Sequence, residues 1–267
     1  MKKQSFYFAA MILASLAVFT ACKKDNNNNY NPPAPVVNAQ VFSVASDSNG
    51  IITKLNDFRN TLGATLNSAP GAIGGRREVN WDGVPANLTN VNGFPSDFFG
   101  SSDPLLANGR KRGLLMTNTG TSFRVDSTDF SEVDASYADQ FNRFSPKRLF
   151  VYMGNNVTEC TFKVPGTTTD AFIKGFGAIF NDVDDANSTS LEFFSGTKSL
   201  GVYKAQASAS GQFSLLGVYF PDEKVTRVRI TSGNGLLANG TKDITSGGTK
   251  DLVVMDDFLY DEPKPVQ

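Results

Sequence analysis

The clearest strand in this sequence is Val225-Thr226-Arg227-Val228-Arg229-Ile230. Thr226, Val228 and Ile230 form an inward face, and the two arginines between them make the opposite face polar. A period of two residues is typical of a β-strand with one buried side, as found in antiparallel sheets. The segment therefore predicts a strand that covers a hydrophobic core.

Similar strands, separated by turn residues, occupy most of the chain. They are predicted at 41–45, around 79, and at 113–117, 122–126, 148–153, 160–164, 171–181, 190–194, 199–204, 213–220, 225–231 and 252–260. One helix is predicted at 51–62, because apolar residues recur there at helical spacing and Gly63 follows as a stop. We therefore expect an all-β fold, a jelly-roll-like antiparallel β-sandwich with one short N-terminal helix.

The amino end has the pattern of a bacterial export signal. Lys2 and Lys3 precede an apolar run at 6–19, and Phe19-Thr20-Ala21-Cys22 resembles the lipobox of bacterial lipoproteins, although position 19 is usually aliphatic. The run is shorter than the ~20 apolar residues of a transmembrane helix. We expect lipidation of Cys22 and anchoring through the lipid; the alternative is an ordinary cleaved signal with a cysteine there by chance.

The charged residues after Cys22 resemble those of Bacteroidetes-type lipoproteins, in which such residues often accompany surface display. We therefore expect the protein at the outer membrane or the cell surface. The expected boundaries are a signal peptide at 1–21, a polar tether at 22–40, a β-sandwich domain at 41–262 and a C-terminal tail at 263–267.

Composition excludes several classes of function. The chain has 25 basic and 26 acidic residues, and a nucleic-acid partner would require clustered excess Lys and Arg. It has no His, which excludes Ser-His-Asp and Cys-His chemistry and the usual imidazole-based metal sites. A metal would have to be a hard, oxygen-ligated cation, so calcium is the leading candidate. With Cys22 lipidated, Cys160 is left unpaired, and we interpret it as a small buried hydrophobe.

Six segments together resemble a family of exported bacterial β-sandwich proteins, many of which carry PEP-CTERM sorting tails. The segments are 75–85, 144–150, 162–167, 175–184, 190–194 and 253–260. The resemblance implies a jelly-roll-like sandwich similar to MAM and carbohydrate-binding modules, and it implies no activity. This chain departs from the family in having a lipobox instead of a C-terminal sorting tail.

Two groups of carboxylates are candidate metal ligands. Asp182, Asp184 and Asp185 lie in a loop where acidic side chains at nearby positions can converge on one calcium ion; the alternative is a solvated turn. Asp256 and Asp257 interrupt an apolar strand, so one of them has to face the interior. A buried carboxylate needs a cation, an arginine or several N–H donors, and resemblance to carbohydrate-binding modules implies calcium there. The alternative is pairing with Arg76 or Arg77.

The third candidate site is in the Gly- and Pro-rich segment 69–103, which predicts a structured loop. Turns are predicted at Asn92-Gly93 and, just after this segment, at Asn108-Gly109. Trp81, Asp82, Arg76 and Arg77 could form a ligand-binding surface in which the Trp81 ring stacks on a sugar. The alternative is a loop plug, with Trp81 buried and Arg and Asp paired beneath it.

The function expected from these observations is a lipid-anchored binding module of the cell envelope. Its ligand would be a glycan or an envelope protein, and calcium would stabilise the fold. Two alternatives remain, a glycoside hydrolase that uses a pair of carboxylates and a purely structural envelope protein.

Overall fold

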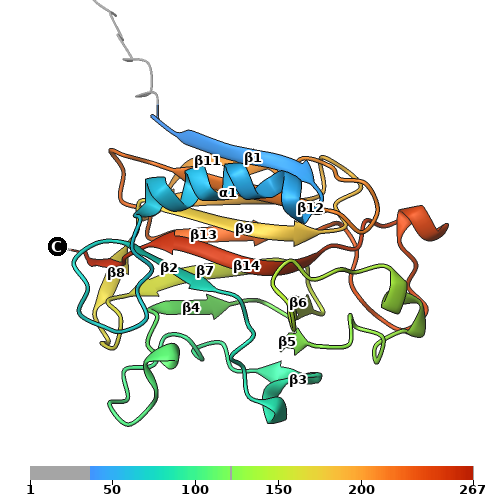
Figure 1. Cartoon of the computed structure of the whole chain (residues 1–267), viewed down its shortest axis with the longest axis horizontal. Helices are drawn as coiled ribbons and strands as arrows, with labels where there is room; N and C mark the ends of the chain where they lie inside the picture. The colour runs from blue at the N-terminus through green and yellow to red at the C-terminus, as the bar shows by residue number, and fades with distance from the viewer. Residues whose placement is uncertain (1–36, 121, 267) are drawn as a thin grey trace, which may run out of the picture. The chain divides into compact units, whose positions relative to one another are not determined.

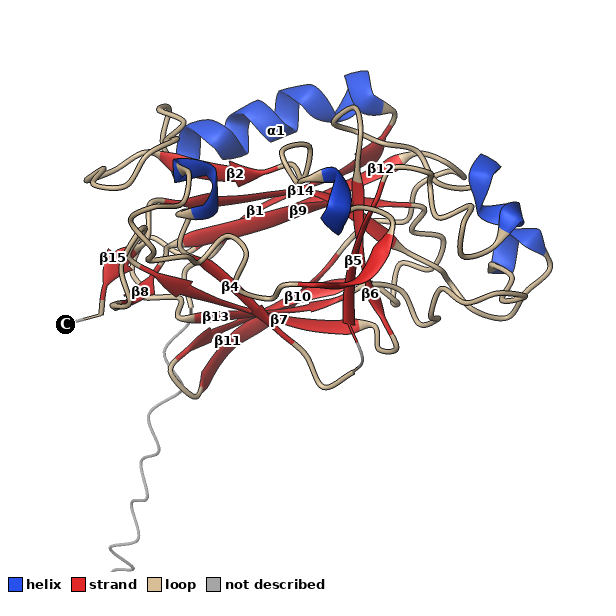
Figure 2. Ribbon diagram, turned by 90° about the horizontal axis from the view of Figure 1, so that it is seen from below, coloured by secondary structure: helices blue, strands red, loops and turns tan. Residues whose placement is uncertain are grey.

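Two antiparallel sheets pack face to face in the computed structural model, which describes residues 37–120 and 122–266 (Figure 1, Figure 2). The predicted β-sandwich with one helix near the amino end is therefore confirmed. Within the described residues the one α-helix is α1 (Ser48–Leu62). Four short 3-10 helices accompany it: η1 (Ala86–Leu88), η2 (Asn108–Arg110), η3 (Ala135–Asp139) and η4 (Ile244–Ser246).

The first sheet has the strand order β1-β12-β9-β14-β6-β5-β3, and β2 also pairs with β14. Its strands are β1 (Gln40–Ser46), β2 (Arg76–Val79), β3 (Val91–Phe94), β5 (Ser122–Asp126), β6 (Leu149–Met153), β9 (Gly175–Asn181), β12 (Phe213–Tyr219) and β14 (Val254–Asp261). Strands distant in sequence are therefore neighbours, so the loops between them bring distant residues together at the ends of the sheet.

The second sheet has the order β11-β10-β13-β7-β8-β15, and β4 also pairs with β7. Its strands are β4 (Leu114–Thr117), β7 (Val157–Lys163), β8 (Asp170–Phe172), β10 (Ser190–Ser195), β11 (Lys198–Lys204), β13 (Arg227–Thr231) and β15 (Lys264–Pro265). Val228 and Ile230 of β13 are fully buried, whereas Arg227 and Arg229 bind Glu159 on the outer face. The alternation in β13 is thus as predicted.

The main core lies between the sheets and is rich in aromatic side chains. The ring of Trp81 stacks on Phe150 with the centroids 4.1 Å apart, and it meets Phe258 at 5.2 Å in an edge-to-face arrangement. Aromatic pairs of this kind contribute about 0.5–1.5 kcal/mol beyond their burial. Cys160 is fully buried in the same core, as predicted, and burial raises the pKa of its thiol.

Helix α1 covers the outer face of the first sheet (Figure 1, Figure 2). The Asp47 side chain accepts a hydrogen bond from the Gly50 amide (2.7 Å) and caps the amino end, and Gly63 follows the last helical residue, as predicted. Phe58 on the buried face of the helix lies over Gly177 of β9 and Gly217 of β12, which are directly paired. The absence of side chains on these two strand residues makes room for the Phe58 ring.

Three details differ from the sequence-based expectations. The strand predicted at 171–181 is two strands, because the chain leaves β8 in the second sheet and enters β9 in the first. Lys174 and Gly175, at this crossing, donate backbone N–H bonds to the buried carboxylate of Asp261 (2.7 and 2.8 Å). The turn predicted at Asn92-Gly93 is wrong, since both residues lie in β3, where the register shifts after Asn92. Part of the expected tail forms β15.

The described residues, 37–120 and 122–266, belong to one compact unit. The predicted signal peptide, the lipidated Cys22 and most of the tether lie outside the described residues. In the described part of the chain, no helix combines the length and apolar character that a membrane span requires.

Candidate metal centre

Asp182 and Asp184 follow the carboxyl end of β9. Asp182 has a φ of 65°, in the left-handed region, so the chain turns directly after the strand. Val183, between the two aspartates, is fully buried in the main core. The carboxylate of Asp182 accepts hydrogen bonds from Gln140 Nε2 (2.8 Å) and from the Gly211 amide (3.2 Å), which fix its position.

The third member of the cluster, Asp243, comes from a segment about 60 residues further along the chain. It caps η4, because its Oδ2 accepts hydrogen bonds from the Thr245 amide (2.8 Å) and the Thr245 hydroxyl (2.6 Å). Its Oδ1 accepts a further bond from the Leu252 amide (2.8 Å). These hydrogen bonds hold the Asp243 carboxylate in place at the end of the sandwich.

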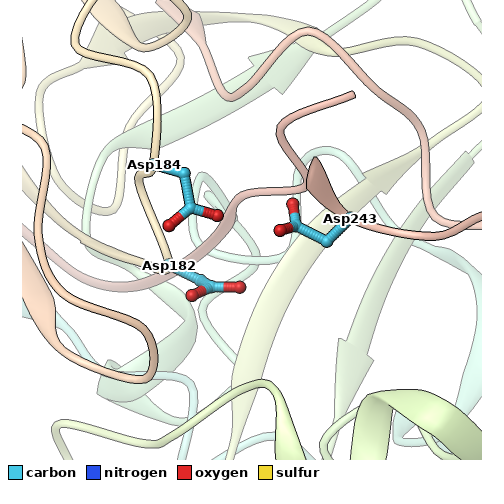
Figure 3. A group of neighbouring side chains, drawn as sticks. All are labelled: Asp182, Asp184 and Asp243. Carbon is cyan, nitrogen blue, oxygen red and sulfur yellow. The ribbon is translucent and has the colours of Figure 1, made fainter. Parts of the chain in front are cut away.

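The carboxylates of Asp182, Asp184 and Asp243 point toward one another (Figure 3). Each offers one oxygen, and these oxygens all lie within 4.8 Å of one another. Asp182 and Asp243 are fully buried. Asp184 is partly exposed, but its Oδ2 atom is buried and has no hydrogen-bond partner in the structure. The cluster therefore combines buried negative charge with at least one unused acceptor.

A fourth carboxylate, Asp251, lies close by and shapes the loop that carries the cluster. It accepts hydrogen bonds from the amides of Asp184 (3.2 Å) and Asp185 (3.1 Å) and from the Ser188 hydroxyl. Among the described residues, no Lys or Arg forms an ion pair with Asp251 or with the three clustered aspartates. Four carboxyl groups thus share a site without a basic side chain to neutralise them.

The pKa values of the cluster reflect this arrangement. Burial, the contact with Asp243 and the neighbouring negative charges raise the pKa of Asp184 to about 8. Burial likewise raises the pKa of Asp182 to about 6. Burial also acts to raise the pKa of Asp243, but hydrogen bonds from Thr245 and Leu252 outweigh it and hold that pKa below its ordinary value. In the absence of a cation, the raised pKa therefore favours a protonated Asp184 at neutral pH.

A metal ion could take the place of this proton. Two oxygens bound to one calcium ion are at most about 5.2 Å apart, which is twice the longest usual Ca–O distance, whereas the corresponding limit for magnesium is about 4.2 Å. The spacing of up to 4.8 Å fits within the calcium limit. The buried aspartate cluster could thus hold a hard cation through oxygen ligands.

The loop 181–188 supplies two of its three predicted ligands. Asp185 is not part of the cluster, because its Oδ1 accepts the Asn187 amide (2.8 Å) in a local turn. For Asp185 the turn alternative is therefore correct. Asp243 was not predicted, because its local sequence, an Asp two residues before a Thr, has the usual pattern of a capped turn.

Asp256 and Asp257 are both buried, and they are not members of this cluster. Asp256 accepts hydrogen bonds from the amides of Phe144 (2.6 Å) and Ser145 (3.2 Å). The Ser145 hydroxyl lies 2.7 Å from an oxygen of Asp256 and 2.8 Å from one of Asp257. Burial and the adjacent Asp257 raise the pKa of Asp256 well above its ordinary value. Backbone amides and the Ser145 hydroxyl, rather than arginines, bind the pair.

The alternative for Asp256 and Asp257, pairing with Arg76 or Arg77, is not what the structure shows. Arg77 is fully buried and forms a two-bond ion pair with Glu262 (2.8 Å for each bond). Arg76 binds Glu78 (2.6 Å). Both arginines in β2 therefore pair with glutamates, Arg76 with Glu78 of the same strand and Arg77 with Glu262.

Trp81 is a plug in the core rather than an exposed platform. Its side chain is 1% exposed, and its indole N–H donates to the backbone oxygen of Asp256 (2.6 Å). Burial raises the pKa of Asp82, whose backbone oxygen accepts a bond from Arg148. The expected sugar-stacking surface at Trp81, Asp82, Arg76 and Arg77 is therefore not formed.

No family model, no curated protein and no solved structure matches this chain. The resemblance to exported PEP-CTERM-type proteins stays a prediction.

Proposed function

We propose that this chain is a lipid-anchored binding module of the bacterial cell surface in which calcium joins the loops at one end of the β-sandwich. The observation that carries the proposal is the group of Asp182, Asp184 and Asp243, two of them buried, which form no ion pair with a basic side chain in the described part of the chain. Such a group is costly unless protons or a cation neutralise it. The export signal and Cys22 support the location, and the predicted partners are a glycan or an envelope protein.

Calcium would act by joining two distant segments. Asp182 and Asp184 follow β9, whereas Asp243 belongs to the loop that leads through η4 to β14. An ion bound to all three would fix the two loops relative to each other, and it would stabilise the folded state because the unfolded chain does not hold the site together. Loops fixed in this way would give a binding module a constant surface.

The test is thermal unfolding of the mature chain carrying Cys22→Ser, in calcium and in a chelator. At a calcium concentration 100 times the dissociation constant, stability should rise by about 2.7 kcal/mol. For a domain of this size the melting temperature should then rise by about 5–10 °C. Magnesium at the same concentration should give a smaller rise.

Variants localise the effect. Asp184→Asn and Asp243→Asn should abolish the response to calcium. In chelator, Asp184→Asn should melt higher than the parent protein because an unfavourable carboxyl group is removed, whereas Asp243→Asn should melt no higher because it also loses hydrogen-bond acceptors for Thr245 and Leu252. Asp185→Asn is the matched control, since Asp185 lies in the same loop outside the cluster. An equal response of all three variants, or no response in the parent protein, would refute the calcium site.

The anchor is tested separately in cells. Full-length protein should incorporate labelled fatty acid and remain with the membrane fraction, and Cys22→Ser should do neither. A screen of the calcium-loaded protein on a glycan array then tests the predicted ligand class. Absence of binding, with and without calcium, would favour an envelope protein as the partner.

A further inference from the structure

A cavity of about 320 Å³ lies between β2 and the segment that carries η2, the green loop below β4 in Figure 1. Its size is at the lower end of the range for small-molecule sites. The lining is mainly apolar and aromatic, with arginines as its charged members. The lining residues are Val79, Asn80, Trp81, Gly83, Pro85, Phe98, Phe99, Leu106, Ala107, Gly109, Arg110 and Arg112.

Arg110 is held in place but keeps donors free. Its Nε donates to the Phe98 backbone oxygen (2.8 Å), and its guanidinium lies over the Phe98 ring, 3.8 Å from the centroid. Its two terminal nitrogens have no hydrogen-bond partner among the described residues, and Arg110 forms no ion pair there. The stacked position fixes the guanidinium plane and leaves its outer edge available.

Arg112 adds a second positive charge to the same cavity. Its Nε donates to the Gly109 backbone oxygen (3.2 Å), and one terminal nitrogen donates to the backbone oxygen of Glu78. The Glu78 carboxylate is itself occupied by Arg59 and Arg76. Burial lowers the pKa of Arg112, and the Arg77 charge acts in the same direction. Two guanidinium groups therefore share the cavity, and its lining has no Asp or Glu.

We propose that this cavity binds a small aromatic monoanion, with its apolar body against Phe98 and Phe99 and its anionic group on Arg110 and Arg112. Arginine binds planar anions through two parallel hydrogen bonds, and such bonds gain strength beside apolar walls. The cavity and the aspartate cluster share no residue. The inference rests on the binding role proposed above and names a ligand class for it.

The probe is anilinonaphthalene sulfonate, an aromatic monoanion whose fluorescence rises in apolar surroundings. Phenylnaphthylamine, which has the same aromatic body without the sulfonate, is the neutral control. Trp81 is the sole tryptophan of the chain and lines the cavity, so energy transfer from Trp81 reports where the probe binds. We expect one equivalent of the anion to quench Trp81 emission, and the neutral compound to bind at least about tenfold more weakly.

Three variants test the role of the charge. Arg110→Gln should weaken binding of the anion by about tenfold and leave the neutral compound unaffected, whereas Arg110→Lys should retain most of the preference for the anion. Arg227→Gln is the matched control, because Arg227 lies over Phe194 at 3.7 Å in the same way but lines no part of this cavity. Its affinity for both compounds should equal that of the parent protein.

Equal affinity for the two compounds would overturn the proposal, and so would equal losses in Arg110→Gln and Arg227→Gln. A probe that binds without quenching Trp81 would also overturn it, because the compound would then lie elsewhere. The calcium response of the same samples is measured in parallel. If the protein responds to calcium but does not bind the anion, the cavity proposal fails. If it binds the anion but does not respond to calcium, the calcium proposal fails.

Discussion

The packing of α1 on the first sheet depends on the absence of a methyl group at Gly217. A Cβ atom added there would lie 2.8–2.9 Å from three atoms of the Phe58 ring. This is well inside ordinary van der Waals contact, and Phe58 is fully buried, so the ring cannot turn toward solvent. The backbone of Gly217 is not in the left-handed region, so alanine can adopt its conformation. The strain therefore arises from the contact with the helix.

We expect Gly217→Ala to destabilise the fold by about 1–3 kcal/mol, the usual cost of an extra methyl group in a packed core. In a Phe58→Ala background, which itself should cost about 3–5 kcal/mol, the same methyl group would enter the vacated space. Its cost there should fall to zero or become a gain of up to about 1 kcal/mol, because alanine restricts the unfolded chain. The coupling energy between the two positions should thus be about 1–3 kcal/mol.

The assay is urea unfolding of the four proteins of this cycle, followed by circular dichroism. Gly74→Ala serves as the control, because a Cβ there meets no atom within 4 Å. Its stability should stay within about 0.5 kcal/mol of the parent protein. A full cost of Gly217→Ala in the Phe58→Ala background would refute the explanation, since the strain would then come from the sheet and not from the helix.

Other predictions concern buried polar groups. Arg77→Met should cost about 3–5 kcal/mol in urea unfolding because it leaves Glu262 charged and unpaired, and adding Glu262→Gln should recover part of this loss; additive effects would contradict the ion-pair explanation. Burial raises the pKa of Asp261 to about 6, so this group contributes stability below about pH 4 that is lost as the pH rises through 6. Asp261→Asn should therefore gain about 2 kcal/mol relative to the parent protein between pH 4.5 and 7.5, and a pH-independent difference would contradict the assignment. Tyr137→Phe should cost about 1–2 kcal/mol, because the hydroxyl lies 3.0 and 2.9 Å from two backbone oxygens; an unchanged midpoint would show that water replaces it.

The fold was predictable where one face of an element is buried. The alternation in β13 and the helical spacing in α1 both come from local burial, and both are readable without knowledge of partners. The crossing after Ile173 was not predicted, although Lys174 and Gly175 interrupt the apolar run at the point where the chain changes sheets. A single Lys-Gly pair is also compatible with one continuous strand, and Ile173 is fully buried and pairs with Val225, so the local pattern does not distinguish the two arrangements.

The candidate site was predictable only in part for the same reason. Asp182 and Asp184 are close in sequence, and their spacing alone suggested convergence. Asp243 joins them through the strand order of the first sheet, which no local pattern contains. The burial of Trp81 was also not predictable from its neighbours. Asp82 and the two arginines indicate a polar surface, whereas the Trp81 ring packs inside the main core. Exposure depends on how distant segments pack.

The position of Cys160 has a practical consequence. The chain has two cysteines, so a protein with Cys22→Ser carries a single thiol, which lies in β7 between β4 and β13 and has no exposed surface. A thiol reagent can reach it only when those strands separate. The modification rate in native buffer would then report the frequency of opening of the sandwich without denaturant, and a second cysteine introduced on the surface could be labelled selectively while Cys160 stays unmodified.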